Sequence, residues 1–122
     1  MYREKENPLK EKSYAFALKI ARIVTQIQLE EKEYVLSKQL LRAGTSIGAN
    51  VEEALAGQSK RDFTAKMSIS SKEARETKYW LRLLKQSELT SIDVNSLILD
   101  IDELIRILTS IFKTSQQNLT KN

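Results

Sequence analysis

Apolar side chains recur at helical spacing in four stretches of the chain. In the last stretch, for example, they fall at Val94, Ile98, Ile101, Ile105 and Leu108, in steps of four and three residues. This spacing places them on one face of an α-helix, whereas a half-buried strand would alternate apolar and polar residues. The pattern predicts four helices, near residues 8–30, 34–56, 60–86 and 92–114.

Signals for helix ends lie between these stretches. Asn7 precedes a proline, an arrangement that favours an N-cap followed by the first helical residue. Ser59 and residues 90–93 open two further helices with a Ser/Thr-x-x-Asp pattern, and Gly57 is placed to act as a C-cap. Because short links between long amphipathic helices make neighbours antiparallel, the sequence predicts an all-α, up-down-up-down four-helix bundle.

The length of 122 residues suits a single domain, residues 1–122. We expect residues 1–7 and the polar residues 115–122 to form frayed tails. The charged N-terminus is followed by no apolar segment, and the longest apolar run, 14–18, is far too short to cross a membrane. Since there is neither an export signal nor a cysteine, we expect a cytoplasmic protein.

The chain contains no cysteine and no histidine, which excludes most catalytic chemistry. Disulfides, thiolate and imidazole metal sites, and Ser-His-Asp or Cys-His catalysis are all impossible. Gly44 and Gly48 lack the context of a glycine-rich phosphate loop. The carboxylate pairs at 30–31 and 52–53 have no acid, base or metal ligand near them in sequence. We therefore expect no enzymatic activity, no cofactor and no metal.

The third and fourth predicted helices carry more apolar residues than one core-facing stripe needs. This excess predicts a second buried surface, most simply an interface between subunits. The alternative is that a small bundle buries more of each helix. The additional residues are Ile69, Trp80 and Leu83 in the third helix, and Leu97, Leu104, Ile107 and Ile111 in the fourth.

The second predicted helix contains two internal glycines, each costing about 1 kcal/mol relative to alanine. Gly44 and Gly48 are four residues apart and share a face, which predicts close approach of another backbone or a local bend. Arg42, Ser46 and Glu53 form a separate polar face with Asn50 at its edge. That face is either solvated or packed, and the small residues around it favour packing.

Residues 40–54, followed by 58–63 and Glu76-Thr77, resemble the 23S rRNA-intervening-sequence proteins. These are small bacterial four-helix-bundle proteins, often encoded within insertions in ribosomal RNA genes. The resemblance is strongest from residue 36 to residue 84. The most specific part is the string Arg-x-x-x-Ser-Ile-x-x-Asn-[Ile/Val]-x-Glu, which falls on Arg42, Ser46, Ile47, Asn50, Val51 and Glu53.

The resemblance implies a homopentamer without catalytic residues. It also implies kinship with the accessory proteins of diversity-generating retroelements, which associate with RNA and a reverse transcriptase. We expect the motif residues to have a structural or interface role. They are Arg42, Ser46, Asn50, Glu53 and Glu76.

The turn near Gly57 also predicts a specific ion pair. In an antiparallel hairpin that turns there, residues whose numbers sum to about 117 lie at the same level. Arg42 and Glu76 satisfy this relation, and both point away from the predicted core. We therefore predict that they pair, within one subunit or across two.

The net charge of +4 is concentrated in one segment. Residues 59–85 hold eight basic and three acidic side chains, whereas residues 86–112 hold Arg106 against five acidic ones. Of the eight basic residues in segment 59–85, all except Lys66 fall within an arc of about 140° around the third helix. We call this set the basic stripe: Lys60, Arg61, Lys72, Arg75, Lys78, Arg82 and Lys85.

The basic stripe leaves two functions open. Such a stripe can follow an RNA phosphate backbone, with Tyr79 in the same arc stacking on a base. Alternatively, the acidic fourth helix neutralises it through Asp100, Asp102 and Glu103. The first interpretation predicts an oligomer that binds RNA. The second fits a protein-binding scaffold or accessory oligomer that makes no nucleic-acid contact and uses exposed residues such as Trp80.

Overall fold

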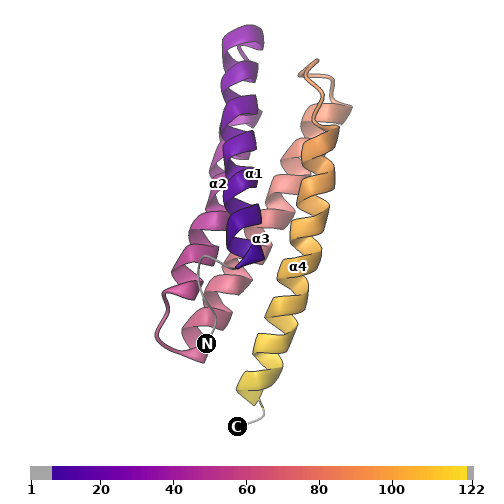
Figure 1. Ribbon diagram of the computed structural model, residues 1–122. Coiled ribbons are helices and arrows are strands. Elements are labelled where there is room, and N and C mark those ends of the chain that lie inside the picture. The colour runs from indigo at the N-terminus through magenta and orange to yellow at the C-terminus, as the bar shows by residue number, and fades with distance from the viewer. Residues whose placement is uncertain (1–6, 121–122) are drawn as a thin grey trace.

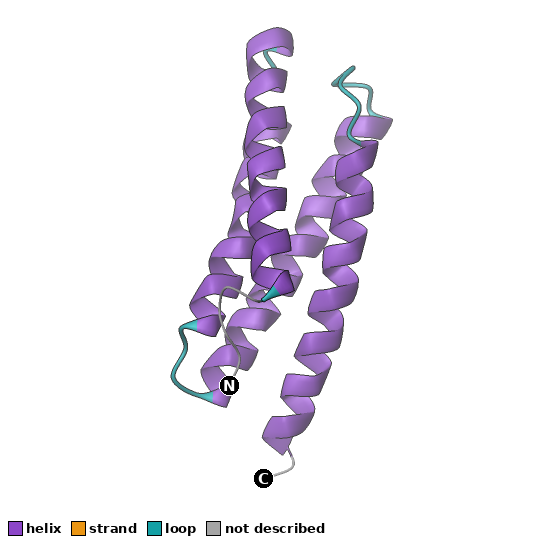
Figure 2. Ribbon diagram, viewed as in Figure 1, coloured by secondary structure: helices purple, strands orange, loops and turns teal. Residues whose placement is uncertain are grey.

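The computed structural model describes residues 7–120, and this part of the chain contains four α-helices and no strand (Figures 1 and 2). None of the helices in these residues is both long enough and apolar enough to cross a membrane. The all-α prediction is confirmed. The elements are α1 (Pro8–Gln26), its π-helical continuation η2 (Ile27–Glu31), α2 (Val35–Leu55), α3 (Lys60–Gln86) and α4 (Asn95–Thr120).

Each helix runs antiparallel to the one before it, and α4 returns beside α1 (Figure 1). Lys12 pairs with Glu103 and Lys19 with Asp100, so residue numbers rise along α1 as they fall along α4. The same reversal relates α2 to α3, and α3 to α4. This arrangement fits the predicted up-down-up-down topology.

Two of the three predicted helix starts are confirmed. The Asn7 side chain accepts a hydrogen bond from the Lys10 backbone N–H at 3.2 Å, and Ser59 Oγ accepts one from the Asp62 N–H at 3.0 Å. The start predicted at residues 90–93 is wrong, because α4 begins at Asn95, and just before it the Asp93 side chain accepts a hydrogen bond from the Asn95 N–H.

Gly57 acts differently from a left-handed C-cap, because no glycine in residues 7–120 has a positive φ. A Cβ at Gly57 would require the flexible Asp62 carboxylate to move and would lie 3.1 Å from the carbonyl oxygen of Ala54.

The C-terminal helix is longer than predicted. Residues 115–120, expected to belong to a frayed tail, continue α4 to Thr120. Ser115 forms a hydrogen bond with Thr64 of α3, which gives the polar end of α4 a partner that no periodicity could reveal. The rest of both predicted tails, residues 1–6 and 121–122, lies outside the described residues.

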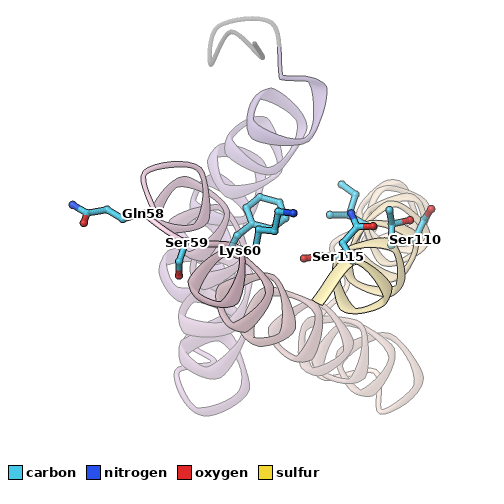
Figure 3. Close-up of a pocket in the computed structure, with 10 residues that line it drawn as sticks. Gln58, Ser59, Lys60, Ser110 and Ser115 are labelled. Atoms are coloured by element: carbon cyan, nitrogen blue, oxygen red, sulfur yellow. The ribbon is translucent and has the colours of Figure 1, made fainter. Parts of the chain in front are cut away.

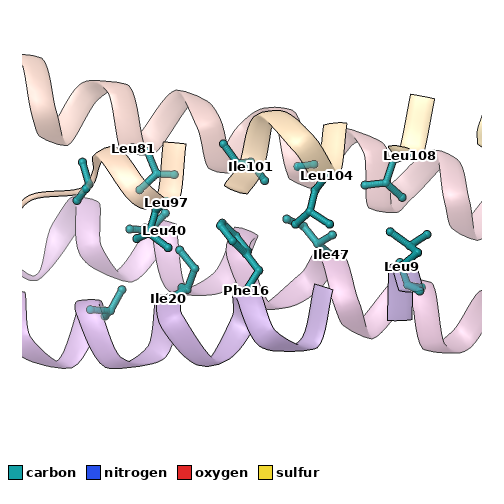
Figure 4. Close-up of a cluster of buried hydrophobic side chains, with 14 of the residues drawn as sticks. Leu9, Phe16, Ile20, Leu40, Ile47, Leu81, Leu97, Ile101, Leu104 and Leu108 are labelled. Carbon is teal, nitrogen blue, oxygen red and sulfur yellow. The ribbon is translucent and has the colours of Figure 1, made fainter. Parts of the chain in front are cut away.

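The core combines apolar side chains from all four helices (Figure 4). In α4 the predicted core stripe is displaced around the helix. Leu97 and Leu104 are only 1% and 2% exposed, whereas Ile98 and Ile105 are half-buried. The reason is that α4 packs between α1 and α3, so the centre of its buried face falls between two apolar rows. Leu97 and Leu104 are therefore core residues, and assigning them to a surplus surface was wrong.

The paired glycines of α2 allow α1 to pack closely. A Cβ at Gly48 would lie 3.3 Å from the backbone carbonyl oxygen of Ser13, and one at Gly44 would lie 3.0 Å from two side-chain carbons of Ile20. Close approach of another backbone is thus confirmed at Gly48. At Gly44 the space is taken by a fully buried side chain.

Candidate nucleic-acid interface

The basic stripe lies along α3, which buries Met67, Ala74 and Leu81 on its core side. Two stripe residues have polar partners: Lys78 pairs with Asp102 at 2.7 Å, and Arg75 donates to the neutral Thr109 hydroxyl at 3.3 Å. The others form no ion pair with any residue between 7 and 120. These exposed cations are Lys60, Arg61, Lys72, Arg82 and Lys85.

The acidic residues of α4 face mainly toward α1. Asp100 pairs with Lys19 at 2.7 Å, and Glu103 pairs with Lys12 at 3.2 Å. Of the three carboxylates expected to neutralise the basic stripe, only Asp102 contacts a stripe residue. The acidic face of α4 therefore leaves most of the stripe charge uncompensated.

A hollow of about 460 Å³ lies between α3 and α4 and gathers part of the basic stripe. Arg106 of α4 also lines it, so four cations face a single carboxylate. Sequence reasoning missed Arg106 because it stands alone in an acidic segment. Its position four residues after Asp102, on the same helix face, is the signal that could have found it. We call this hollow the cationic groove; its lining residues are Arg75, Lys78, Tyr79, Arg82, Asp102, Ile105 and Arg106.

The structure does not bring the whole basic stripe together. Lys60 lines a different hollow of about 520 Å³, between the α2–α3 turn and the last turns of α4. There Ser115 points from α4 toward the first turn of α3 (Figure 3). Because an α-helix rises about 1.5 Å per residue, Lys60 and Arg82 lie roughly 33 Å apart along α3. Lys60 and Arg61 therefore do not belong to the cationic groove.

The predicted pair between Arg42 and Glu76 is confirmed, and both residues belong to the same chain. Arg42 also contacts Glu73 at 3.3 Å, and the indole N–H of Trp80 donates to Glu76 at 2.9 Å. The ring of Trp80 in turn meets the ring of Tyr79, with centroids 5.1 Å apart and planes inclined by 75°. A series of contacts thus connects the motif arginine of α2 to the cationic groove.

The other motif residues form hydrogen bonds within α2 or a contact with α3. Ser46 Oγ donates to the Arg42 carbonyl at 2.7 Å, and Asn50 Nδ2 donates to the Ser46 carbonyl at 2.8 Å. Glu53 pairs with Lys66 at 2.8 Å, and this hydrogen-bonded partner raises the pKa of Lys66. The motif therefore contributes to the contact between α2 and α3.

Glu31 connects the two halves of the bundle at the end opposite the α2–α3 turn. Its carboxylate accepts hydrogen bonds from the Thr90 hydroxyl, and from the N–H and hydroxyl of Ser91 at 2.8 and 2.7 Å. The Thr90 bond, followed by the two Ser91 bonds, lowers the pKa of Glu31. The sequence could not reveal these partners because they lie about sixty residues away. We call this set of contacts the Glu31 clasp.

Comparison with known proteins agrees with the resemblance in the motif. The sequence matches the family model of the 23S rRNA-intervening sequence protein over residues 5–110. A crystal structure of a protein of unknown function from the S23 ribosomal protein family of Bacteroides thetaiotaomicron is 45% identical, with a TM-score of 0.82. That match covers 86% of this chain and 98% of the other. No curated protein matches the sequence.

Proposed function

Because the chain belongs to the 23S rRNA-intervening sequence protein family, we propose that it is a non-enzymatic oligomer that binds RNA through the cationic groove. The proposal assigns the contacts to Arg75, Lys78 and Arg82 of α3 and to Arg106 of α4. It requires no cofactor and no reaction.

The observation that carries the proposal is the charge imbalance of the groove. Four cations line it beside Asp102 alone, and the neighbouring Asp100 and Glu103 pair with lysines of α1. Clustered, uncompensated cations lower the free energy of a nearby phosphate backbone and release its condensed counterions. Such contacts position RNA without reading its sequence. Binding is therefore expected to depend strongly on salt and weakly on sequence.

Oligomerisation would strengthen a modest site of this kind. Copies of the groove in one assembly raise the effective concentration of RNA at each remaining site. Ile69 is 41% exposed and Leu83 is half-buried, and neither packs against the core cluster, so apolar surface remains on α3 outside the core. We propose that this surface contacts another subunit, in a pentamer by preference.

A charge-reversal experiment tests the RNA proposal. The variant Arg82→Glu/Arg106→Glu changes two groove cations that form no ion pair among residues 7–120. Its control, Arg22→Glu/Lys38→Glu, makes the same change in net charge on exposed residues of α1 and α2. Binding of a labelled single-stranded RNA is measured by fluorescence polarisation at several salt concentrations. Circular dichroism checks that both variants fold.

We expect the groove variant to bind RNA at least about tenfold more weakly in 0.1 M salt, because two phosphate contacts are lost. With four contacts, the wild-type slope of log affinity against log salt should be about −3. The control variant should keep both the affinity and the slope. Equal losses in the two variants, or none in either, would mean that the groove is not the RNA site.

The alternative function is a protein-binding scaffold or accessory oligomer without nucleic-acid contact. The observation in its favour is exposed apolar surface outside the groove: Leu29, Val35 and Leu99 are all well exposed. Burial of such side chains depends little on salt, unlike phosphate binding. A wild-type protein that binds no RNA even at low salt would favour this function.

A further inference from the structure

Tyr79 occupies the cationic groove with 55% of its surface exposed. Arg75 and Lys78 precede it on α3 and Arg82 follows it by three residues, so cationic side chains lie on both sides of the ring along the helix. Arg106 lines the same groove from α4. The core does not account for this placement, because Tyr79 lies outside the cluster of buried and packed apolar side chains.

The ring of Tyr79 rests against a side chain that is itself held in place. Trp80 is half-buried against the core, and its indole N–H donates to Glu76 at 2.9 Å. Glu76 is in turn paired with Arg42 from α2. The planes of the two rings are inclined by 75°, so Trp80 supports Tyr79 without stacking on it in parallel. An aromatic ring held in this way loses little conformational freedom when a ligand stacks on it.

We infer that Tyr79 stacks on an unpaired base and that the groove therefore selects single-stranded RNA over duplex RNA. This inference rests on the proposed RNA-binding function and specifies its substrate. In a single strand the bases can unstack and place one face on an aromatic ring while cations hold the flanking phosphates. In a duplex each base lies between its neighbours, so only phosphates and 2′-hydroxyls remain for the protein.

The size of the groove agrees with this choice. Its volume of about 460 Å³ falls in the range of sites that enclose small ligands, and so suits a nucleotide or two. The body of a double helix would lie across such a hollow and would contact only its charged rim. The cations should therefore contribute to both RNA forms, whereas Tyr79 should contribute to the single strand alone.

The experiment compares the wild type with Tyr79→Leu and Tyr79→Phe. Leucine keeps apolar bulk but has no aromatic face, and phenylalanine keeps the ring and loses only the hydroxyl. The probes are a labelled oligouridylate of about twelve nucleotides and a fully paired RNA duplex of the same length, titrated over a range of salt concentrations. Trp80 is the only tryptophan of the chain, so its fluorescence also reports on the adjacent ring.

We expect Tyr79→Leu to weaken single-strand binding about tenfold and to leave duplex affinity within about twofold. The salt slope should not change, because no phosphate contact is lost. Tyr79→Phe should bind both probes like the wild type. Single strands should alter the Trp80 emission of the wild type, and duplex should not.

The outcomes separate this inference from the function on which it rests. If the wild type binds both probes equally and Tyr79→Leu leaves their ratio unchanged, the stacking role is overturned while RNA binding stands. If Tyr79→Leu weakens both probes alike, Tyr79 shapes the groove and does not stack on a base. If the wild type binds neither probe at low salt, the proposed function itself fails.

Discussion

At the scale of single residues, the polar side chains inside the bundle are all satisfied. Ser70 Oγ donates to the Ile47 carbonyl at 2.9 Å, and Thr77 Oγ1 donates to the Glu73 carbonyl at 2.7 Å. Within residues 7–120 no buried side-chain nitrogen or oxygen lacks a hydrogen-bond partner. Small hydroxyl residues in the buried face of α3 therefore let α2 approach closely without leaving an unsatisfied group.

The Glu31 clasp predicts a pH-dependent contribution to stability. The pKa of Glu31 is lowered from its ordinary value of 4.5, chiefly by the Thr90 hydrogen bond, so the folded state favours the charged carboxylate. Its contribution to the free energy of unfolding is complete above pH 4.5 and is lost as the pH falls through the lower pKa of the folded state. We expect Glu31→Gln to melt below the wild type at pH 7.

The control for the clasp is Glu30→Gln, which removes the same charge from the neighbouring exposed carboxylate. Thermal melts followed by circular dichroism at several pH values compare the three proteins. The Glu31→Gln deficit should shrink as acid protonates the wild-type carboxylate. A deficit that is the same at all pH values, or one that Glu30→Gln shares, would contradict this account.

At the scale of the helices, periodicity predicted the four α-helices but neither the π-helical segment η2, which lies at the end of the predicted first helix, nor the rotation of α4. Its apolar rows are wide enough that either Ile98 and Ile105 or Leu97 and Leu104 could have faced the core. Which of the two rows faces the core depends on the contact with α1, because Lys12 and Lys19 of α1 pair with Glu103 and Asp100 of α4. Those contacts join residues more than eighty positions apart, so a single-helix pattern does not contain them.

The rotation of α4 is testable by comparing two leucines of that helix. Leu104 is 2% exposed and Leu99 is 71% exposed. Leu104→Ala should lower the free energy of unfolding by about 2–5 kcal/mol, because it leaves a cavity in the core. Leu99→Ala should change it by less than about 0.5 kcal/mol. Urea denaturation measures both, and equal effects would place the core on another face of α4.

The candidate site was predictable to a similar extent. Helical spacing alone placed Arg75, Lys78 and Arg82 on one arc with Tyr79. The pair between Arg42 and Glu76 followed from matching residues at the same height in two antiparallel helices. The spacing also grouped distant residues such as Lys60, because a helical wheel discards position along the axis. The sequence pattern could not predict contacts between helices. These contacts bring Arg106 into the groove and direct Asp100 and Glu103 toward α1.

At the scale of the whole molecule, the apolar surface of α3 predicts self-association. The chain mass is 14.0 kDa, and light scattering at micromolar concentration should give a multiple of it, with about 70 kDa for the preferred pentamer. Ile69→Asp should lower that mass, because a charge would be buried at the contact. The matched control is Leu18→Asp on α1, since Leu18 and Ile69 are both 41% exposed. A wild-type mass of about 14 kDa would contradict the prediction.

The antiparallel course of the helices also determines where other molecules can be attached. With four alternating helices, α1 begins and α4 finishes toward the same end of the bundle (Figure 1). Because Lys12 pairs with Glu103, Pro8 lies level with about residue 107, and α4 continues roughly 20 Å beyond it to Thr120. A fusion partner joined before α1 or after α4 would therefore be attached at that end of the bundle. The Glu31 clasp, at the opposite end, would stay clear of it. Joining the start of α1 to the end of α4 with a linker long enough to span this offset, and opening the chain elsewhere, would give a circular permutant with the same helix neighbours.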